Sequence, residues 1–321
     1  MVMSSFGYSS IYSESAPLAG IHPDIIQSHI LSRLDGPTLA TATCTSAALL
    51  SMCSADRLWR DICTSTWPST AAFPSGHRSL YSDAFPASRP VPSAAPADTP
   101  ELISAVDIYY DGAPLYSKVF ATEARSAWFL STPLRLELLG GKETVALPTE
   151  PDGGGGEAPC ASRAAERLGV SWIVIDPARG RAVNVAGRAA VEAGRDWLSG
   201  DIQLRYASVA EDGEMVWCSV AVTCGGKEGG RLRVKEVSMR VEDVEGRLLS
   251  GAESLRVLGA AMEGGRRRSD GVVERESYQR FLRVRRRCRE KNQSRERGLD
   301  MACAATGISI FFAFFLFFLL R

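Results

Sequence analysis

The end of the chain places the strongest constraint on what it can fold into. Met301 to Leu320 is a run of twenty residues without a charge, and its six phenylalanines would cover every face of a helix. At 1.5 Å per residue, such a helix is about 30 Å long, the hydrocarbon thickness of a bilayer. Residues 301–320 are therefore predicted to form a transmembrane tail anchor.

The alternative for this run is a buried terminal helix or strand, because the strongly apolar part is only Ile308 to Leu320. Against that alternative, six phenylalanines at a chain end would form a costly exposed patch if the end frayed. The membrane interpretation is thus preferred. It makes the bilayer an expected partner of the chain.

A basic segment precedes the apolar run and is predicted to be a helix over residues 263–300. From Glu263 to Arg297 there are thirteen Lys or Arg and six Asp or Glu, which is a local net charge of +7. Basic flanks stay on the cytosolic side of a membrane, so the N-terminal domains are expected to be cytosolic. We expect this helix to be solvated beside anionic lipid. Nuclear import through Arg285 to Arg289 is the alternative, which would place the protein in the cytoplasm or nucleus.

The overall composition excludes several classes of chemistry. The formal net charge is zero, so no nucleic-acid partner is expected. The only histidines are at positions 22, 29 and 77, and no two of the eight cysteines form a C-x-x-C pair. Histidine-based catalysis in the rest of the chain and a zinc site are therefore not expected. We predict no catalytic residue, no metal and no cofactor, and thus no enzyme.

The middle of the chain, residues 101–262, is predicted to be a β-rich domain. Ser171 to Asp176 is a short run rich in β-branched and aromatic residues, and the Pro and Gly that follow it favour a turn into a partner strand from Arg181 to Val185. Ile202, Leu204 and Tyr206 alternate with polar residues. Many short strands separated by turns favour an antiparallel sandwich or barrel.

One strand of this domain has a slip in its alternation. Leu232 and Val234 share one parity, whereas Val237, Met239 and Val241 share the other. One extra residue near Lys235 would place all five side chains on the same face. The sequence therefore predicts a β-bulge at that point.

Three tryptophans are candidates for function in the β-rich domain. Trp172 and Trp217 lie inside apolar runs, so both are expected in the core. Trp197 is flanked by Arg195, Asp196 and Gly200, and we predict that it lines a substrate or ligand site. The strands and an Asp-Pro turn also resemble the lectin-like domains of some plant proteins.

The N-terminal part of the chain is predicted to be helical from residue 21 to 67. Ile26, Ile30 and Leu34 are spaced at i, i+4 and i+8, which gives an apolar stripe on a helix with Pro23 in its first turn. Residues 1–20 lack an apolar run and are expected to be disordered, and residues 68–100 are expected to be a Pro-rich linker. A helical hairpin packed on the strands is the alternative for the helices.

These segments together resemble a known family. The order of Ile21 to Leu34, Asp35 to Leu39 and then Leu58-Trp59 is similar to an F-box, and the run Leu58 to Pro68 resembles that of a plant F-box protein family. The Ser171 to Pro177 segment and the basic helix before an apolar terminus are similar as well. The chain is thus expected to be α+β: a small N-terminal trihelical F-box, a mostly antiparallel sandwich-like β domain, a C-terminal helix and a transmembrane segment.

The resemblance implies a function and a set of contact residues. An F-box docks on a Skp-type adaptor, which binds a cullin, so the chain would be the substrate receptor of an SCF-type ubiquitin ligase with a protein substrate on its β domain. The alternative is a membrane-tethered lectin-like module or scaffold whose F-box serves only localisation or turnover. By position, the adaptor face would consist of Ile21, Pro23, Ile25, Ile26, Ile30, Leu31, Leu34 and Leu39.

Overall fold

The structure is a computed structural model that divides into two compact units, Met1–Ile62 and Cys63–Arg321. It describes residues 21–84, 99–148, 161–187, 189–212, 214–226, 232–263 and 271–321, with the backbone alone for 210–212, 214 and 271–274. The predicted disorder of residues 1–20 therefore lies outside the described residues, as do residues 85–98 of the predicted linker.

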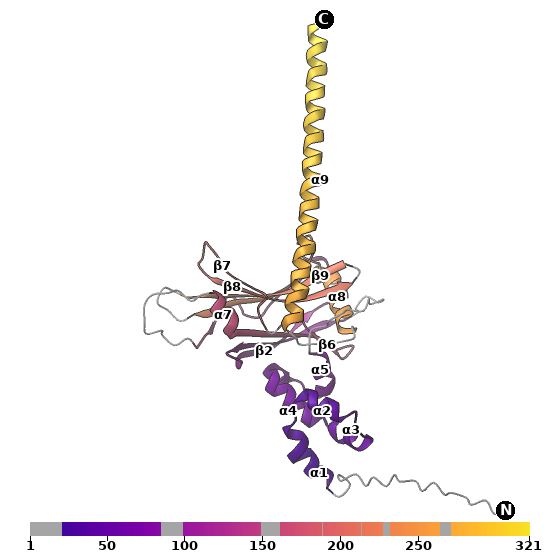
Figure 1. The fold of residues 1–321 in the computed structure, drawn as a ribbon, viewed down its shortest axis with the longest axis vertical. Coiled ribbons are helices and arrows are strands. Elements are labelled where there is room, and N and C mark those ends of the chain that lie inside the picture. The colour runs from indigo at the N-terminus through magenta and orange to yellow at the C-terminus, as the bar shows by residue number, and fades with distance from the viewer. Residues whose placement is uncertain are drawn as a thin grey trace, which may run out of the picture. The chain divides into compact units, whose positions relative to one another are not determined.

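The first unit is helical, as the sequence predicts (Figure 1). Its first helical stretch consists of three short pieces, α1 (Pro23–Ile25), η2 (Ile26–Ile30) and η3 (Leu31–Arg33). Three further helices follow, and the division between the two units falls inside the last of them. These helices are α2 (Gly36–Ala42), α3 (Ala47–Cys53) and α4 (Asp56–Thr66).

The second unit contains two antiparallel sheets. The first has the order β2-β1-β5-β6 and the second has the order β3-β10-β9-β8-β7, with β4 also paired to β10. The first sheet is formed by β1 (Glu101–Tyr110), β2 (Ala113–Glu123), β5 (Leu168–Asp176) and β6 (Arg181–Asn184). The second is formed by β3 (Arg135–Glu137), β4 (Val145–Ala146), β7 (Glu192–Arg195), β8 (Ile202–Asp212), β9 (Glu214–Gly225) and β10 (Arg233–Asp243).

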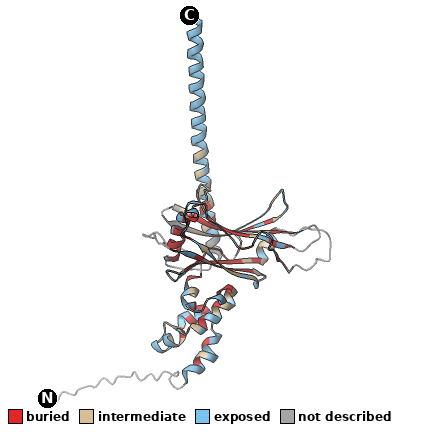
Figure 2. Ribbon diagram, turned by 180° about the vertical axis from the view of Figure 1, so that it is seen from behind, coloured by how far each residue is buried: buried red, intermediate tan, exposed pale blue. Residues whose placement is uncertain are grey.

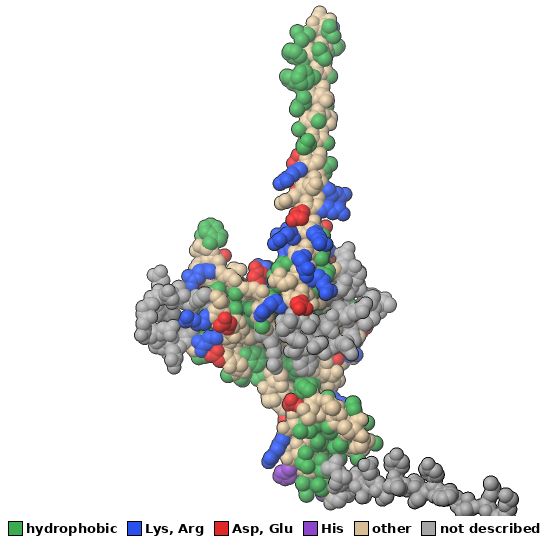
Figure 3. Space-filling model, in the orientation of Figure 1, with side chains coloured by type: hydrophobic (Ala, Val, Ile, Leu, Met, Phe, Trp, Pro, Cys, Tyr) green, Lys and Arg blue, Asp and Glu red, His purple; other side chains and the backbone are tan. Residues whose placement is uncertain are grey.

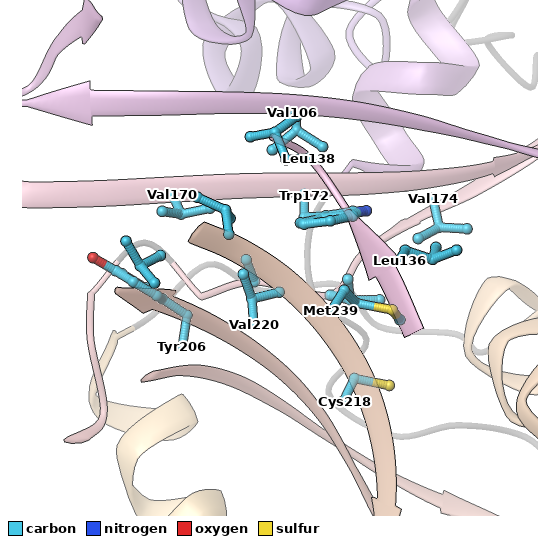
Figure 4. Close-up of a cluster of buried hydrophobic side chains, with 14 of the residues drawn as sticks. Val106, Leu136, Leu138, Val170, Trp172, Val174, Tyr206, Cys218, Val220 and Met239 are labelled. Carbon is cyan, nitrogen blue, oxygen red and sulfur yellow. The ribbon is translucent and has the colours of Figure 1, made fainter. Parts of the chain in front are cut away.

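The inner faces of the two sheets share one hydrophobic core (Figure 4). Val106 and Trp172 from the first sheet lie in the same cluster as Tyr206, Val220 and Met239 from the second. The indole N–H of Trp172 donates to Ser104 Oγ at 3.2 Å, and Tyr206 donates to the Leu168 carbonyl at 2.7 Å. The expected α+β fold with an antiparallel, sandwich-like β domain is confirmed.

Local details of the strands also follow the sequence. β5 and β6 pair across the turn at 177–180, where Gly180 has φ +61°. The predicted bulge lies between Val234 and Glu236, where the register of β10 against β9 shifts. Trp172 and Trp217 are fully buried, as expected for core residues.

The first part of the expected linker is instead folded onto the β domain, which corrects the prediction for residues 68–84. These residues form η4 (Pro68–Ala72) and α5 (His77–Asp83). The backbone N–H and Oγ of Ser69 donate to the buried Asp107 carboxylate at 2.8 and 2.6 Å. Asp83 accepts from the Ala182 N–H at 3.2 Å and pairs with Arg181 at 2.8 Å. Burial raises the pKa of Asp107, although the bonds from Ser69 and Ser117 oppose that rise.

The same segment covers the outer face of the first sheet. Trp67 and Ala84 cluster with Ala105 and Ile173, whose neighbours Val106 and Trp172 point into the core between the sheets. A strand that is buried on both faces has no polar alternation. This explains why the β5 sequence is an almost continuous apolar run.

Two helices lie between strands, α6 (Ala127–Ser131) and α7 (Ala161–Arg167), and α8 (Gly251–Glu263) follows the last strand, β10. α8 begins with a reciprocal capping box. The Ser250 backbone N–H donates to Glu253 Oε2 at 2.8 Å, and the Glu253 N–H donates to Ser250 Oγ at 3.3 Å. Arg247, together with Ser250, lowers the pKa of Glu253 to about 2.

The last helix, α9 (Gly271–Leu319), is a single helix of 49 residues (Figure 1). Its beginning is docked, which corrects the expectation of a wholly solvated basic helix. Tyr278 and Phe281 are buried on the outer face of the second sheet, with their rings 5.1 and 5.5 Å from that of Trp217. Beyond this contact α9 is largely exposed along its length (Figure 2).

Candidate functional site

The first helical stretch of the N-terminal unit carries most of the predicted contact residues. Pro23 stands in its first turn, where the missing N–H costs nothing, and His22 Nδ1 accepts from the Asp24 N–H at 3.3 Å. The following helix, α2, is capped by Asp35, whose Oδ1 accepts from the Thr38 N–H at 3.0 Å. Hydrogen bonds from Thr38 hold the pKa of Asp35 below its usual value.

A π-helical turn changes the face that each residue of this stretch presents. The sequence predicts a regular helix in which Ile26, Ile30 and Leu34 share one stripe, but residues Ile26–Ile30 form a π-helix. A π turn brings residues i and i+5 onto the same side. Accordingly, Ile26 and Leu31 are both buried, at 3 % exposure each, whereas Ile30 is 44 % exposed.

The eight predicted contact residues thus differ in their burial. Three of them are buried, which corrects their expected placement on an open face: Ile26, Leu31 and Leu39. Leu34 is half-buried. Four are exposed in this chain and so are accessible to a partner: Ile21, Pro23, Ile25 and Ile30.

One exposed large hydrophobic residue in the described part of this unit was not among the predicted contacts. Leu50, on α3, is 43 % exposed. Gln27 joins α3 to the first stretch by donating from Nε2 to the Met52 carbonyl at 3.2 Å. In the sequence, Leu50 is marked only by its position in the third short helix of the F-box-like region. Figure 3 shows hydrophobic side chains gathered over this helical unit.

Comparison with known proteins agrees with this geometry. An F-box-like family model matches residues 23–65. A protein of Arabidopsis thaliana, "F-box protein At2g27310", is 37 % identical over 328 residues, covering 95 % of this chain and 97 % of that protein. The chain belongs to the plant F-box protein family. "Probable F-box protein At2g36090" of the same plant is 39 % identical over 91 % of this chain and 90 % of its own length. No solved structure matches the chain.

The last helix of the F-box carries a tryptophan whose side chain is buried. Trp59, on α4, is 2 % exposed, and its indole N–H donates to the Cys53 carbonyl at 2.7 Å. Leu58 beside it is also buried. The Leu-Trp pair that supports the family resemblance therefore stabilises the end of the F-box and is not part of its exposed surface.

The β domain of this F-box protein presents a second candidate at the β7–β8 turn. Trp197 is 90 % exposed and Leu198 is 80 % exposed. Asp196 Oδ1 organises the turn by accepting from the N–H groups of Leu198 and Ser199, at 3.0 and 2.8 Å. These bonds hold the pKa of Asp196 below its usual value. The role predicted for Trp197 in substrate binding stays a prediction.

The described residues hold neither a cluster suited to a metal ion nor, at Cys218 and Cys224, an ionised thiol. No group of three or more His, Cys, Asp or Glu in that part of the chain is placed to hold a metal ion. Burial raises the pKa values of the Cys218 and Cys224 thiols to about 12, so both are protonated at neutral pH and are poor nucleophiles.

The C-terminal helix is the third candidate. Within the described part of the chain, residues Arg275–Leu319 of α9 are long and apolar enough to include one membrane span, by length and composition. The hydrophobic side chains at its end are exposed, for example Phe311 at 67 % and Phe318 at 75 %.

Proposed function

We propose that this chain is the substrate-receptor subunit of an SCF-type ubiquitin ligase. The observation that carries the proposal is the F-box itself, which leaves Ile25 and Ile30 exposed on its first helical stretch and Ile21 exposed just before it. Large aliphatic side chains that protrude from a small module favour docking into an apolar groove of a partner. That partner is a Skp-type adaptor, which in turn binds a cullin.

The β domain would hold the protein to be ubiquitinated. Its core is complete within the unit, with Trp172, Trp217 and Tyr206 fully buried. A folded module of this kind can present a recognition surface without chemistry of its own. The protein then acts by raising the effective concentration of substrate near the ubiquitin-charged enzyme.

We further propose that α9 anchors the protein in a membrane through residues 301–320. The helix is already formed, so its backbone groups are paired before insertion, which a bilayer requires. The basic residues of the 283–297 segment would remain on the cytosolic side, where the ubiquitin machinery is.

Co-purification of the full-length protein from detergent-solubilised membranes tests both parts. We expect the Skp-type adaptor and a cullin to be recovered together with it. Recovery of glycans without a cullin would favour the tethered lectin-like module, and recovery of neither would favour a scaffold. Carbonate extraction tests the anchor separately: full-length protein should stay in the pellet, and a form ending at Asp300 should be released.

A further inference from the structure

The β7–β8 turn and the C-terminal helix are fixed to one another. The Tyr278 hydroxyl on α9 donates to Glu192 Oε2 on β7 at 2.9 Å. On the same face, Tyr278 and Phe281 pack against Trp217 of β9, together with Ala207 of β8. The helix is therefore docked on the strands that carry the turn.

A partly buried ion pair orients the helix further. Arg285 Nη2 lies 3.6 Å from Glu242 Oε2 of β10, and both side chains are less than one-fifth exposed. Tyr278 is a neutral donor, because burial and the bond to Glu192 raise its pKa. Contacts to four strands thus set the direction in which α9 leaves the sandwich.

The turn itself is built to present two apolar side chains. Asp196 Oδ1 accepts hydrogen bonds from the N–H groups of Leu198 and Ser199 and from Ser199 Oγ, the last at 3.1 Å. Gly200 supplies the positive φ of +72° that closes the turn. A preorganised turn loses little entropy when it binds, which favours its use as an anchor.

The turn lies on the side of the sandwich from which α9 leaves. Figures 1 and 2, viewed from opposite sides, both show the β7–β8 hairpin extending toward that side. Figure 3 shows hydrophobic side chains at the end of this hairpin. With the helix end in a bilayer, the turn would face the membrane surface.

The turn nevertheless stops short of the bilayer. From Tyr278 to Met301 the helix rises about 35 Å at ~1.5 Å per residue. From Glu192 to Trp197 the strand extends at most about 17 Å at ~3.3 Å per residue. The turn therefore ends about 18 Å short of the level of Met301, where the apolar run begins. This distance exceeds the ~5–8 Å depth of one headgroup region. Between Tyr278 and Met301 there is no Pro and a single Gly, Gly298, and α9 runs through it without a break, so the gap is set by a continuous helical spacer.

We propose that Trp197 and Leu198 form the substrate anchor, and that the substrates are integral membrane proteins held by a cytosolic segment close to the bilayer. This inference rests on the proposed receptor function and on the membrane anchor. Exposed aromatic and aliphatic side chains on a rigid turn are typical binding anchors. The docked helix places them in the narrow layer of cytosol that the juxtamembrane segments of such proteins occupy.

Site-specific photo-crosslinking in membranes that contain the full-length protein tests this. A photoreactive phenylalanine analogue is placed at position 197 or, as the matched control, at position 128, because Trp128 is also strongly exposed, at 75 %. We expect position 197 to crosslink a carbonate-resistant protein, at a site within roughly 20 Å of its span, in at least tenfold higher yield than position 128. Leu198→Asp in the same chain should remove that product.

Lengthening the spacer tests the geometry. Insertion of seven helix-forming residues after Glu296 adds about 10 Å and nearly two turns. The crosslinked site on the partner should then move away from its span by a similar distance, and Gly298→Ala should leave it unchanged. Crosslinking to lipid, to soluble proteins only, or at a site that ignores the insertion would each overturn the inference. A failure of the anchor is seen separately, as release of the unmodified protein by carbonate.

Discussion

The F-box and the β domain bury their apolar side chains to different extents. In the β domain, the large side chains of both sheets are enclosed, and flanking segments even cover the outer faces, with Trp67 on one sheet and Phe281 on the other. In the F-box, Ile21, Ile25, Ile30 and Leu50 remain 40–50 % exposed. A module this small buries too little surface to be strongly stable alone. This difference supports the proposal that the F-box docks on a partner through its exposed aliphatic side chains.

The largest expected effect is on the core of the β domain. Trp172→Ala removes a fully buried indole and its bond to Ser104, so it should lower the free energy of unfolding by about 3–5 kcal/mol. Trp128→Ala, at an exposed position, should change it by less than about 0.5 kcal/mol. Denaturant titration followed by fluorescence and circular dichroism measures both. Equal losses of unfolding free energy in the two variants would contradict the claim that Trp172 is enclosed in the core.

Within the F-box, a smaller but sharper contrast is expected between Leu39 and Ile30. Leu39 is fully buried, so Leu39→Ala should destabilise this unit by about 2–4 kcal/mol. Ile30→Ala should cost less, about 0.5–1 kcal/mol, because 44 % of that residue is already exposed to water. Hydrogen exchange of the F-box amides distinguishes the two. Greater loss of protection in the Ile30 variant would mean that the regular stripe, not the π turn, describes this helix.

The smallest effect concerns the cap of α8. Glu253→Gln weakens the capping box and the pair with Arg247, which should cost about 1 kcal/mol. Because the folded pKa of about 2 lies below the ordinary 4.5, this stability is present above pH ~4.5 and is lost as the pH falls toward 2. Acid titration of stability should therefore be shallower in the variant. An unchanged acid limb would contradict the role of the carboxylate.

Local patterns predicted much of the β domain. The alternation of Ile202, Leu204 and Tyr206 and the slip near Lys235 are properties of single strands, and both were found as predicted. Side-chain parity depends only on the backbone repeat of a strand, so it can be read without knowing the neighbours. The order of the strands in each sheet could not be read in this way.

Features that depend on distant partners were missed. The π turn at Ile26–Ile30 changes which side chains are buried, and no local signal distinguishes it from a regular helix. The docking of Ser69 on Asp107 and of Tyr278 on Glu192 joins residues 38 and 86 positions apart. From the sequence alone, polar residues in a Pro-rich or basic segment are expected to be solvated, because their partners in the β domain cannot be identified. The exposure of Leu50 was likewise not predicted, because it depends on how the helices pack against one another.

The most direct test of the central claim is the affinity of the F-box for a purified Skp-type adaptor. Ile30→Asp places a charge on the exposed face without disturbing the buried residues, whereas Ser32→Asp adds the same charge at another exposed position of the same helical stretch. We expect Ile30→Asp to raise the Kd at least about 30-fold, equivalent to about 2 kcal/mol, with an unchanged circular dichroism spectrum. Ser32→Asp should stay within about threefold of the unmodified protein. Wild-type affinity in the Ile30 variant would contradict the account that this exposed face binds the adaptor.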